Sequence, residues 1–176
     1  TSALISQGHK RLLLVSAEDP AVDIDYLEEM IMAVYETRNG RGSIRRLNVN
    51  VAPMGMKNFK RIKDTGIGTY QLFQETYHVD TYNKVHVSGP KTDYLKRLYA
   101  CDDAQRSGID DVGIGVLFGL YQYKFEVMAL LFHAMHLEER FGVGPHTISI
   151  PRLEPAQGSD ISSHPPYPVS DLELKK

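Results

Sequence analysis

Polar and titratable residues occur together in two short stretches that each follow an apolar, strand-like run. Glu18 and Asp19 come directly after the run Arg11 to Ser16, and Gln74 to His78 end the third such run. In α/β proteins with parallel strands, ligands bind beyond the carboxyl ends of the strands. Carboxylates there suit an ammonium or hydroxyl group, whereas glutamine, tyrosine and histidine add donors, acceptors and a titratable base. Both stretches are candidate ligand-binding segments, although solvated turns are polar as well.

Three further polar residues lie where they could contact a ligand. Arg97 falls within a predicted helix, where a solvated face or an ion pair is its ordinary role. Arg152 follows the last predicted strand, and Asn50 lies on the same strand face as Asn48. We predict that Asn50 and Arg152 contact a substrate. The sequence by itself identifies no catalytic residue.

Other chemical interpretations have weaker support. Gly113, Gly115 and Gly119 have GxGxxxG spacing and begin inside a strand, so they fail as a dinucleotide fingerprint, and close approach of a flat ring explains them better. His133 and His136 lack the HExxH spacing and a third ligand, which favours structural histidines over a zinc site. Cys101 has no activating partner in the sequence and is expected to pack within a helix. No metal site is predicted.

Alternating strand-like and helical segments predict an α/β protein with a parallel sheet. The predicted strands are 11–16, 46–51, 69–75, 111–117 and 147–151. The predicted helices are 26–38, 56–63, 92–106 and 124–140, with 77–90 expected as a polar loop and 153–169 without regular structure. In the helix 124–140 we expect a buried stripe of Val127, Leu130, Leu131, Ala134 and Leu137.

Two architectures fit these elements: an open doubly wound sheet, or a fragment of an eight-stranded barrel. Asn48 and Asn50 share one strand face, and Gln71, Phe73 and Glu75 share another. A sheet covered by helices on both faces disfavours polar inward residues, whereas a barrel that binds a polar ligand at its mouth accommodates them. We therefore favour the barrel fragment.

Composition excludes several classes of protein. The chain has 176 residues, a formal net charge of −2 and 42% hydrophobic residues, as expected for one ordinary globular domain. The charge balance argues against nucleic-acid binding, and no apolar run is long enough to span a membrane. A single cysteine favours a reducing, cytoplasmic compartment. Gly8 resembles a helix end and Ser170 with Glu173 a capping box, so both termini are expected to be cut through helices of a longer protein.

Five blocks of sequence together resemble the aromatic amino-acid lyases of the radical S-adenosylmethionine (SAM) superfamily. The blocks are Leu12–Asp19, Phe73–Tyr77, His86–Asp93, Gly108–Gly115 and Ile150–Arg152. The match is stronger to the tyrosine lyases that mature the iron-only hydrogenase than to the 2-iminoacetate synthases of thiamine synthesis. The resemblance implies a (βα)8 barrel of which residues 1–176 form a partial domain, roughly strands two to six.

The resemblance also implies the residues that bind the cofactor. Glu18 matches the glutamate that holds the SAM amino group, with Ala17 in place of the usual glycine, and Arg97 matches an arginine that binds the SAM carboxylate. Gly113 and Ile114 match the strand along the adenine, and Gln74 and Glu75 match a region that lines the pocket. The implied cofactors are SAM and a 4Fe–4S cluster.

Cluster binding lies outside what this chain can supply. The resemblance places the CxxxCxxC motif before residue 1, a second-cluster domain after residue 176 and a substrate-carboxylate arginine after it as well, so the fragment alone is expected to be inactive. The implied activity of the whole protein is cleavage of tyrosine to p-cresol and dehydroglycine, which leads to CO and cyanide for other hydrogenase maturation proteins. The alternatives are the thiamine-pathway synthase, a non-catalytic α/β module that binds a nucleotide or a protein, and a zinc protein using His133 and His136.

Overall fold

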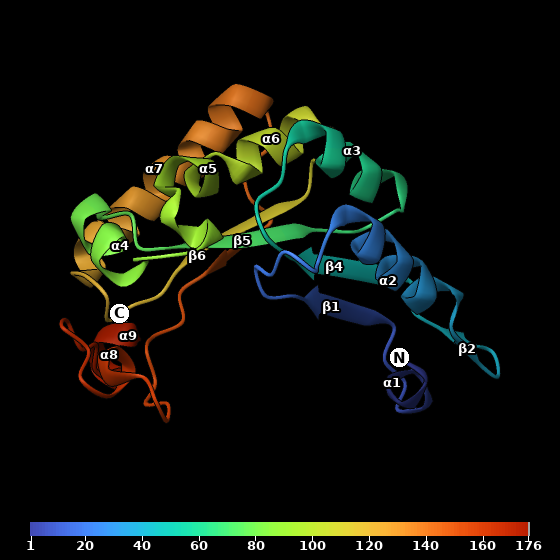
Figure 1. The fold of residues 1–176 in the computed structure, drawn as a ribbon, viewed down its shortest axis with the longest axis horizontal. Coiled ribbons are helices and arrows are strands. Elements are labelled where there is room, and N and C mark those ends of the chain that lie inside the picture. The colour runs from blue at the N-terminus through green and yellow to red at the C-terminus, as the bar shows by residue number, and fades with distance from the viewer. Residues whose placement is uncertain (176) are drawn as a thin grey trace. The chain divides into compact units, whose positions relative to one another are not determined.

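The structure is a computed structural model that describes residues 1–175 (Figure 1). Parallel strands form one sheet in the order β1-β4-β5-β6-β7. These strands are β1 (Arg11–Val15), β4 (Arg46–Asn50), β5 (Tyr70–Glu75), β6 (Val112–Val116) and β7 (Thr147–Ser149). The sequential order is that of consecutive βα units, as the sequence predicted. The chain divides into two compact units, Thr1–Leu72 with Tyr99–Val112, and Phe73–Leu98 with Gly113–Lys176, which are described separately.

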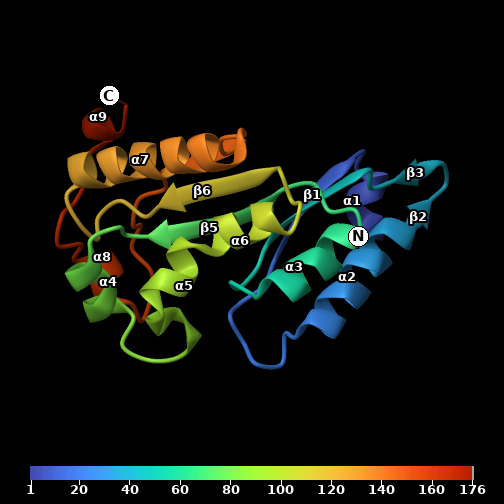
Figure 2. The same cartoon turned by 90° about the horizontal axis from the view of Figure 1, so that it is seen from above.

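The first unit places helices over one face of β1 and β4. The helices on that side are α2 (Ile24–Glu36), α3 (Met56–Asp64) and α6 (Ala100–Arg106), whereas α1 (Ser2–Ser6) lies away from them (Figure 1). α2 and α3 pack side by side, and α3 also contacts α6 (Figure 2). Leu47 and Val49 are buried under the helices, and the Phe59 ring meets Tyr70 edge-to-face with centroids 4.8 Å apart. Alternate residues of β4, among them Asn48 and Asn50, lie on the opposite face, as predicted.

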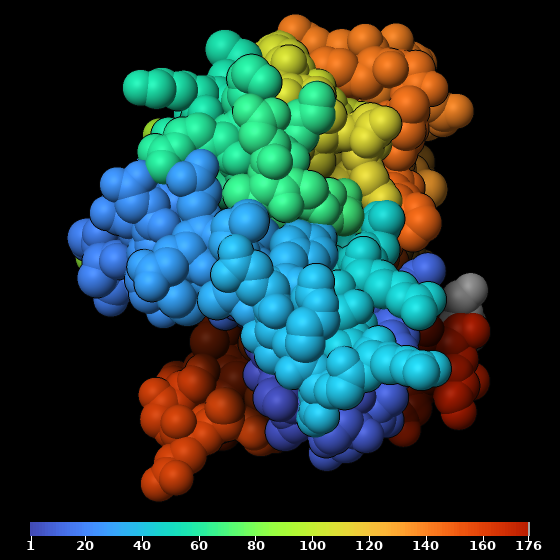
Figure 3. Space-filling model, turned by 90° about the vertical axis from the view of Figure 1, so that its right-hand side faces the viewer, coloured from blue at the N-terminus to red at the C-terminus, as the bar shows by residue number. Residues whose placement is uncertain are grey.

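A short hairpin in the first unit was not predicted. It consists of β2 (Arg38–Asn39) and β3 (Gly42–Ser43), which are antiparallel. In Figure 3 this cyan hairpin lies against the dark-blue α1, in line with the contacts between these elements. A Cβ atom at Gly42 would lie only 2.5 Å from Ile5 Cγ2, so this close approach requires glycine.

The second unit surrounds the end of β5 with helices. They are α4 (Val79–Val85), η1 (Pro90–Thr92), α5 (Tyr94–Leu98), α7 (Tyr123–Phe141), α8 (Asp160–Ser163) and α9 (Asp171–Leu174). Figure 2 shows α7 running alongside β6. Ile114, Val116, Leu130 and Leu137 are buried in this unit. Among residues 1–175, no helix is long and apolar enough to cross a membrane.

Four sequence-based predictions about helices were wrong. Residues 153–169, which were expected to have no regular structure, contain α8. Residues 77–90 contain α4, because His78 caps a helix by accepting a hydrogen bond from the Thr81 N–H. The predicted helix 92–106 is interrupted at Asp93 and at Tyr99, so this range contains the end of η1, then α5 and α6. Leu131 is 48% exposed instead of buried, whereas Glu126 is fully buried on α7.

Two further helices begin with a side-chain cap. Asp23 caps α2 by accepting a hydrogen bond from the Tyr26 N–H, 2.9 Å away. Ser170 and Glu173 form the predicted reciprocal capping box at the start of α9.

Candidate cofactor-binding site

Arg97 and Glu75 form a largely buried ion pair at the carboxyl end of β5. Arg97 Nη2 lies 3.3 Å from Glu75 Oε1, and Arg97 Nε donates to the Phe73 carbonyl oxygen at 2.7 Å. The Arg97 residue is only 6% exposed. Burial of a guanidinium requires paired and hydrogen-bonded surroundings, and these two partners provide them. Arg97 therefore lies in the interior of the unit and not on the solvated helix face that is the ordinary position for such a residue.

Lys91 adds a second cation to the same carboxylate. Its Nζ lies 3.1 Å from Glu75 Oε1. Two cations therefore lie beside this one carboxylate, and such cations suit a ligand that brings a carboxylate of its own. Sequence reasoning missed Lys91, although it lies in one of the blocks that carry the family resemblance.

The backbone at Glu75 adopts an unusual conformation. Its φ is +71°, and no other non-glycine residue among 1–175 has a positive φ. A left-handed conformation at a residue with a side chain is uncommon and persists only where surrounding contacts hold it. The Glu75 carbonyl oxygen accepts a hydrogen bond from the Leu117 N–H at 2.8 Å, which fixes one side of this turn.

Glu126 holds the other side of the turn. This carboxylate is fully buried, accepts a hydrogen bond from Thr76 Oγ1 and accepts another from the Tyr77 N–H at 2.9 Å. Burial raises the pKa of Glu126, and its hydrogen bonds to Thr76 and Tyr77 and the nearby His78 oppose that rise. Sequence reasoning assigned no role to this residue. Its signal was its spacing of four residues from Leu130, which places a carboxylate on the buried stripe of α7.

The raised pKa of Glu126 predicts a pH-dependent stability difference. A carboxyl group whose pKa is higher in the folded state contributes stability at low pH that is lost as the pH rises through the folded value. The melting temperature of the full-length Glu126→Gln variant should therefore rise relative to wild type as the pH increases from the unfolded glutamate value of about 4.3 through the higher folded value. Thermal denaturation of both proteins across this range measures the difference. A constant difference would contradict a raised pKa.

The predicted site residues fall into groups that the strand geometry separates. Successive side chains of a strand point to opposite faces, so Gln74, which is 3% exposed, lies on the buried face opposite Glu75. Ile114 is likewise buried, on the opposite face of β6 from Gly113 and Gly115. The structure thus brings together Glu75 and Arg97, and it leaves the side chains of Gln74 and Ile114 on the other face.

Gly115 makes room for a ring of the protein itself. A Cβ atom at this position would lie 2.7 Å from Phe73 Cδ1 and 2.7 Å from the Ser149 carbonyl oxygen. The strand glycine therefore allows Phe73 and β7 to approach β6.

Arg152 is paired with carboxylates of its own unit. It contacts Glu154 at 2.7 Å and also pairs with Asp171 in the first turn of α9. The two partners raise the pKa of Arg152 above its ordinary value. Arg152 thus links the segment after β7 to α9 near the end of the chain.

Glu18 and Asn50 lie at the carboxyl ends of β1 and β4 in the first unit. Val15 and Asn50 are paired in the parallel register, and the Ser16 N–H donates to the Asn50 carbonyl oxygen at 3.1 Å. Both residues are half-buried. The edge of the strands on which they lie is the one where parallel α/β folds bind ligands.

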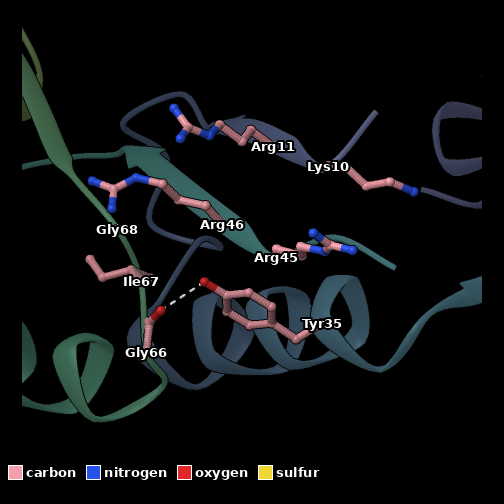
Figure 4. Close-up of a pocket in the computed structure, with 8 residues that line it drawn as sticks. All are labelled: Lys10, Arg11, Tyr35, Arg45, Arg46, Gly66, Ile67 and Gly68. Carbon is pink, nitrogen blue, oxygen red and sulfur yellow. Dashed lines mark hydrogen bonds between the residues drawn. The ribbon is translucent and has the colours of Figure 1, made fainter. Parts of the chain in front are cut away.

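A separate cavity of about 440 Å³ lies at the opposite ends of these strands. Figure 4 shows Lys10, Arg11, Arg45 and Arg46 around it, with the Tyr35 hydroxyl donating to the Gly66 carbonyl oxygen at 2.7 Å. Arg46 pairs with Asp111. Because it adjoins the amino ends of β1 and β4, this cavity is not part of the candidate site.

The remaining chemical candidates do not form sites. No cluster of three metal-ligating side chains occurs among residues 1–175, so His133 and His136 gain no third ligand there, and His133 Nδ1 instead lies 2.7 Å from the Tyr77 hydroxyl. Cys101 is 2% exposed, and burial raises its pKa to about 12. It is the one cysteine in the sequence, so this chain cannot ligate a 4Fe–4S cluster, which needs several thiolates.

Comparison with known proteins identifies close relatives. No protein-family model matches the chain. A crystal structure of HydG, a maturase of the [FeFe]-hydrogenase, matches with a TM-score of 0.95 and 55% identity over 98% of this chain and 38% of its own. HydG from Carboxydothermus hydrogenoformans matches with a TM-score of 0.80 and 50% identity over 86% of this chain and 35% of its own.

More distant similarities point to the same group of proteins. The 2-iminoacetate synthase of Escherichia coli is 31% identical over 160 residues, which are 90% of this chain and 41% of that protein. Methylornithine synthase (PylB), at 20% identity and a TM-score of 0.72, shares the fold. The chain spans about two fifths of the length of the curated relatives it matches. Over nearly its whole length the chain is thus similar to part of the HydG maturases and of 2-iminoacetate synthase, and its parallel α/β fold matches part of theirs.

Proposed function

We propose that this chain contributes the SAM-binding wall of a radical SAM tyrosine lyase of the HydG type. The observation that carries the proposal is the buried Arg97 beside Glu75 at the carboxyl end of β5, in a chain that is 55% identical to HydG over nearly its whole length. Residues 1–176 then form a partial barrel domain. The cluster-binding segment and a C-terminal domain would belong to other parts of the protein.

The chemistry of the donor set fits SAM. SAM presents a carboxylate, an ammonium group and ribose hydroxyls, and the chain offers the cations Arg97 and Lys91 with the carboxylates Glu75 and Glu18. We assign the SAM carboxylate to Arg97, the amino group to Glu18 and the ribose to Glu75, with the backbone at Gly113 and Ile114 along the adenine. Gln74 supports this wall from its buried face, and Asn50 and Arg152 remain proposed substrate contacts.

Reductive cleavage of bound SAM would supply the 5′-deoxyadenosyl radical that takes a hydrogen atom from tyrosine. The 4Fe–4S cluster would be held by residues outside this chain. The contribution of the residues described above is to bind, orient and exclude water. Cleavage of the tyrosine Cα–Cβ bond would then give dehydroglycine and a hydroxybenzyl radical, which takes up one electron from the reductant and one proton to become p-cresol, and dehydroglycine would lead to CO and cyanide. In this proposal the protein is cytoplasmic and acts with other hydrogenase maturation proteins.

Anaerobic turnover by the reconstituted full-length protein tests the proposal. With SAM, a reductant and tyrosine, we expect p-cresol by chromatography and about tenfold weaker SAM binding in Glu18→Gln, whereas Glu29→Gln on the exposed face of α2 serves as the matched control. Cleavage of SAM without formation of p-cresol would show that the protein cleaves SAM but that tyrosine is not its substrate. Absence of both reactions in the cluster-loaded protein would reject the proposal.

One second candidate has direct support. The identity of 31% to 2-iminoacetate synthase leaves the thiamine-pathway reaction as the alternative, since our proposal gives both enzymes the same first cleavage. A cyanide assay in the same reaction separates them, because only the HydG-type reaction continues to cyanide.

A further inference from the structure

The turn that follows β5 is tied to two helices of its unit, α7 and α5. Glu126 on α7 binds Thr76 and Tyr77, as described above, and His133, also on α7, lies 2.7 Å from the Tyr77 hydroxyl. From α5, the Tyr94 hydroxyl donates to the Tyr77 carbonyl oxygen at 2.9 Å. Residues 75–78 are therefore held in place by hydrogen bonds from α7 and from α5, and they do not form a solvated loop.

Within this turn, the Thr76 hydroxyl links Glu126 to the backbone. It donates to Glu126 and accepts from the His78 N–H at 3.1 Å, and Thr76 is fully buried. Glu126 thus binds the Tyr77 N–H directly and the His78 N–H through Thr76. These two peptide groups follow shortly after Glu75, the residue with the left-handed conformation. Such a conformation is retained only when neighbouring contacts determine it.

The same contacts also register α5 against the turn. Tyr94 and Arg97 are three residues apart and lie on one side of the helix, so the hydrogen bond from Tyr94 to Tyr77 and the ion pair from Arg97 to Glu75 act on the same edge. A shift of the turn would move the Glu75 carboxylate relative to both Arg97 and Lys91.

A buried carboxylate is an expensive way to hold a turn if stability alone is the purpose. Its desolvation disfavours the folded state, and neutral hydrogen-bonding residues could join the same groups at less cost. A carboxylate does, however, accept hydrogen bonds at both oxygens, so it fixes the positions of two donors relative to each other.

We propose that Glu126 is a positioning residue for SAM: through Thr76 and the Tyr77 N–H it fixes the turn at Glu75 and thereby sets the geometry of the Glu75–Arg97–Lys91 group. Glu126 does not touch the ligand. The inference rests on the proposed function, since it assigns the purpose of that geometry to SAM binding.

The test uses Thr76→Val, which keeps the shape of the side chain but removes the hydroxyl, in the reconstituted full-length protein. We expect the KM for SAM to rise at least tenfold while kcat at saturating SAM stays within threefold. Thr76→Ser, which keeps the hydroxyl, is expected to restore most of the lost affinity. A purely structural role would instead lower the active fraction, and so kcat, with KM unchanged, and that result would overturn the proposal.

Glu126 itself is tested by a double-mutant cycle. Glu126→Met is apolar and of similar length, and it removes the acceptor of both Thr76 and the Tyr77 N–H, so it is expected to raise the KM for SAM at least as much as Thr76→Val. Because Thr76 acts through its hydrogen bond to Glu126, the double variant should show little increase over Glu126→Met alone. Additive effects would mean that Thr76 acts without Glu126, which would also overturn the proposal.

Hydrogen exchange separates this inference from the proposed function. If wild-type protein fails to bind SAM, the proposed function fails, and exchange at residues 75–78 still reports on the turn. Faster exchange there in Thr76→Val and Glu126→Met than in Thr76→Ser would support the positioning of the turn. Unchanged exchange together with unchanged SAM affinity would reject the positioning role and leave the proposed function standing.

Discussion

Replacing Arg97 with leucine in the full-length protein is expected to weaken SAM binding at least a hundredfold and to lower the free energy of unfolding by about 3 kcal/mol. The guanidinium is 6% exposed and binds the Phe73 carbonyl oxygen and Glu75. Its removal leaves a mostly buried carbonyl without this donor and takes one cation from Glu75. Breaking a buried charge pair from one side is costly because the remaining charge stays desolvated.

Two variants make this result specific to the guanidinium. Arg97→Lys keeps the charge but loses the planar set of donors, so it should recover part of the stability and little of the affinity. Lys96→Ala removes a charge from the exposed side of the same helix and should leave SAM binding within twofold. SAM affinity is measured by equilibrium dialysis and stability by chemical denaturation. A folded Arg97→Leu protein that binds SAM as tightly as wild type would exclude Arg97 from the site.

The second large effect is expected for Gly115→Ala, at about 2 kcal/mol of lost stability. The added methyl group would lie 2.7 Å from the Ser149 carbonyl oxygen, which belongs to the β7 backbone and cannot rotate away. It would also lie 2.7 Å from the Phe73 ring. Since the Phe73 carbonyl oxygen accepts the hydrogen bond from Arg97 Nε, displacement of this residue should weaken SAM binding as well.

Gly144→Ala is the matched control for this substitution. Gly144 lies outside the helices and strands, its φ is not in the left-handed region, and a Cβ atom there would make only an ordinary contact with Glu138 Cβ at 3.7 Å. Denaturant midpoints of the two variants should therefore differ clearly, with Gly144→Ala close to wild type. Equal stability of Gly115→Ala and wild type would show that β6 and β7 separate easily at this point.

Much of the fold could be predicted from local patterns. The strands were located to within one or two residues because each is a short apolar or alternating run bounded by turn residues. Helix ends with side-chain caps, at Asp23 and Ser170, were also predictable because the capping residue is itself the signal. The α4 helix was missed because its cap is a histidine, which is not a common capping residue, and its sequence is polar.

The site was less predictable, because its contacts join segments that are distant in sequence. Arg97 and Glu75 were named from the family resemblance, but nothing in their spacing of 22 residues indicated an ion pair. The break at Tyr99 and the exposure of Leu131 depend on which neighbouring elements cover each helix face, and periodicity does not contain that information. Glu126 was missed because the stripe predicted for α7 was made of apolar residues only, and a buried carboxylate on the same face was not considered.

The burial of Cys101 within α6 makes the thiol a natural sensor of opening of this helix. With its pKa raised to about 12, almost no thiolate exists at neutral pH while the helix is packed, so there is no nucleophile to attack an alkylating reagent. Labelling of this position therefore reports transient exposure of α6. A cysteine introduced elsewhere on the surface of residues 1–175 could then carry a spectroscopic probe with little background from Cys101.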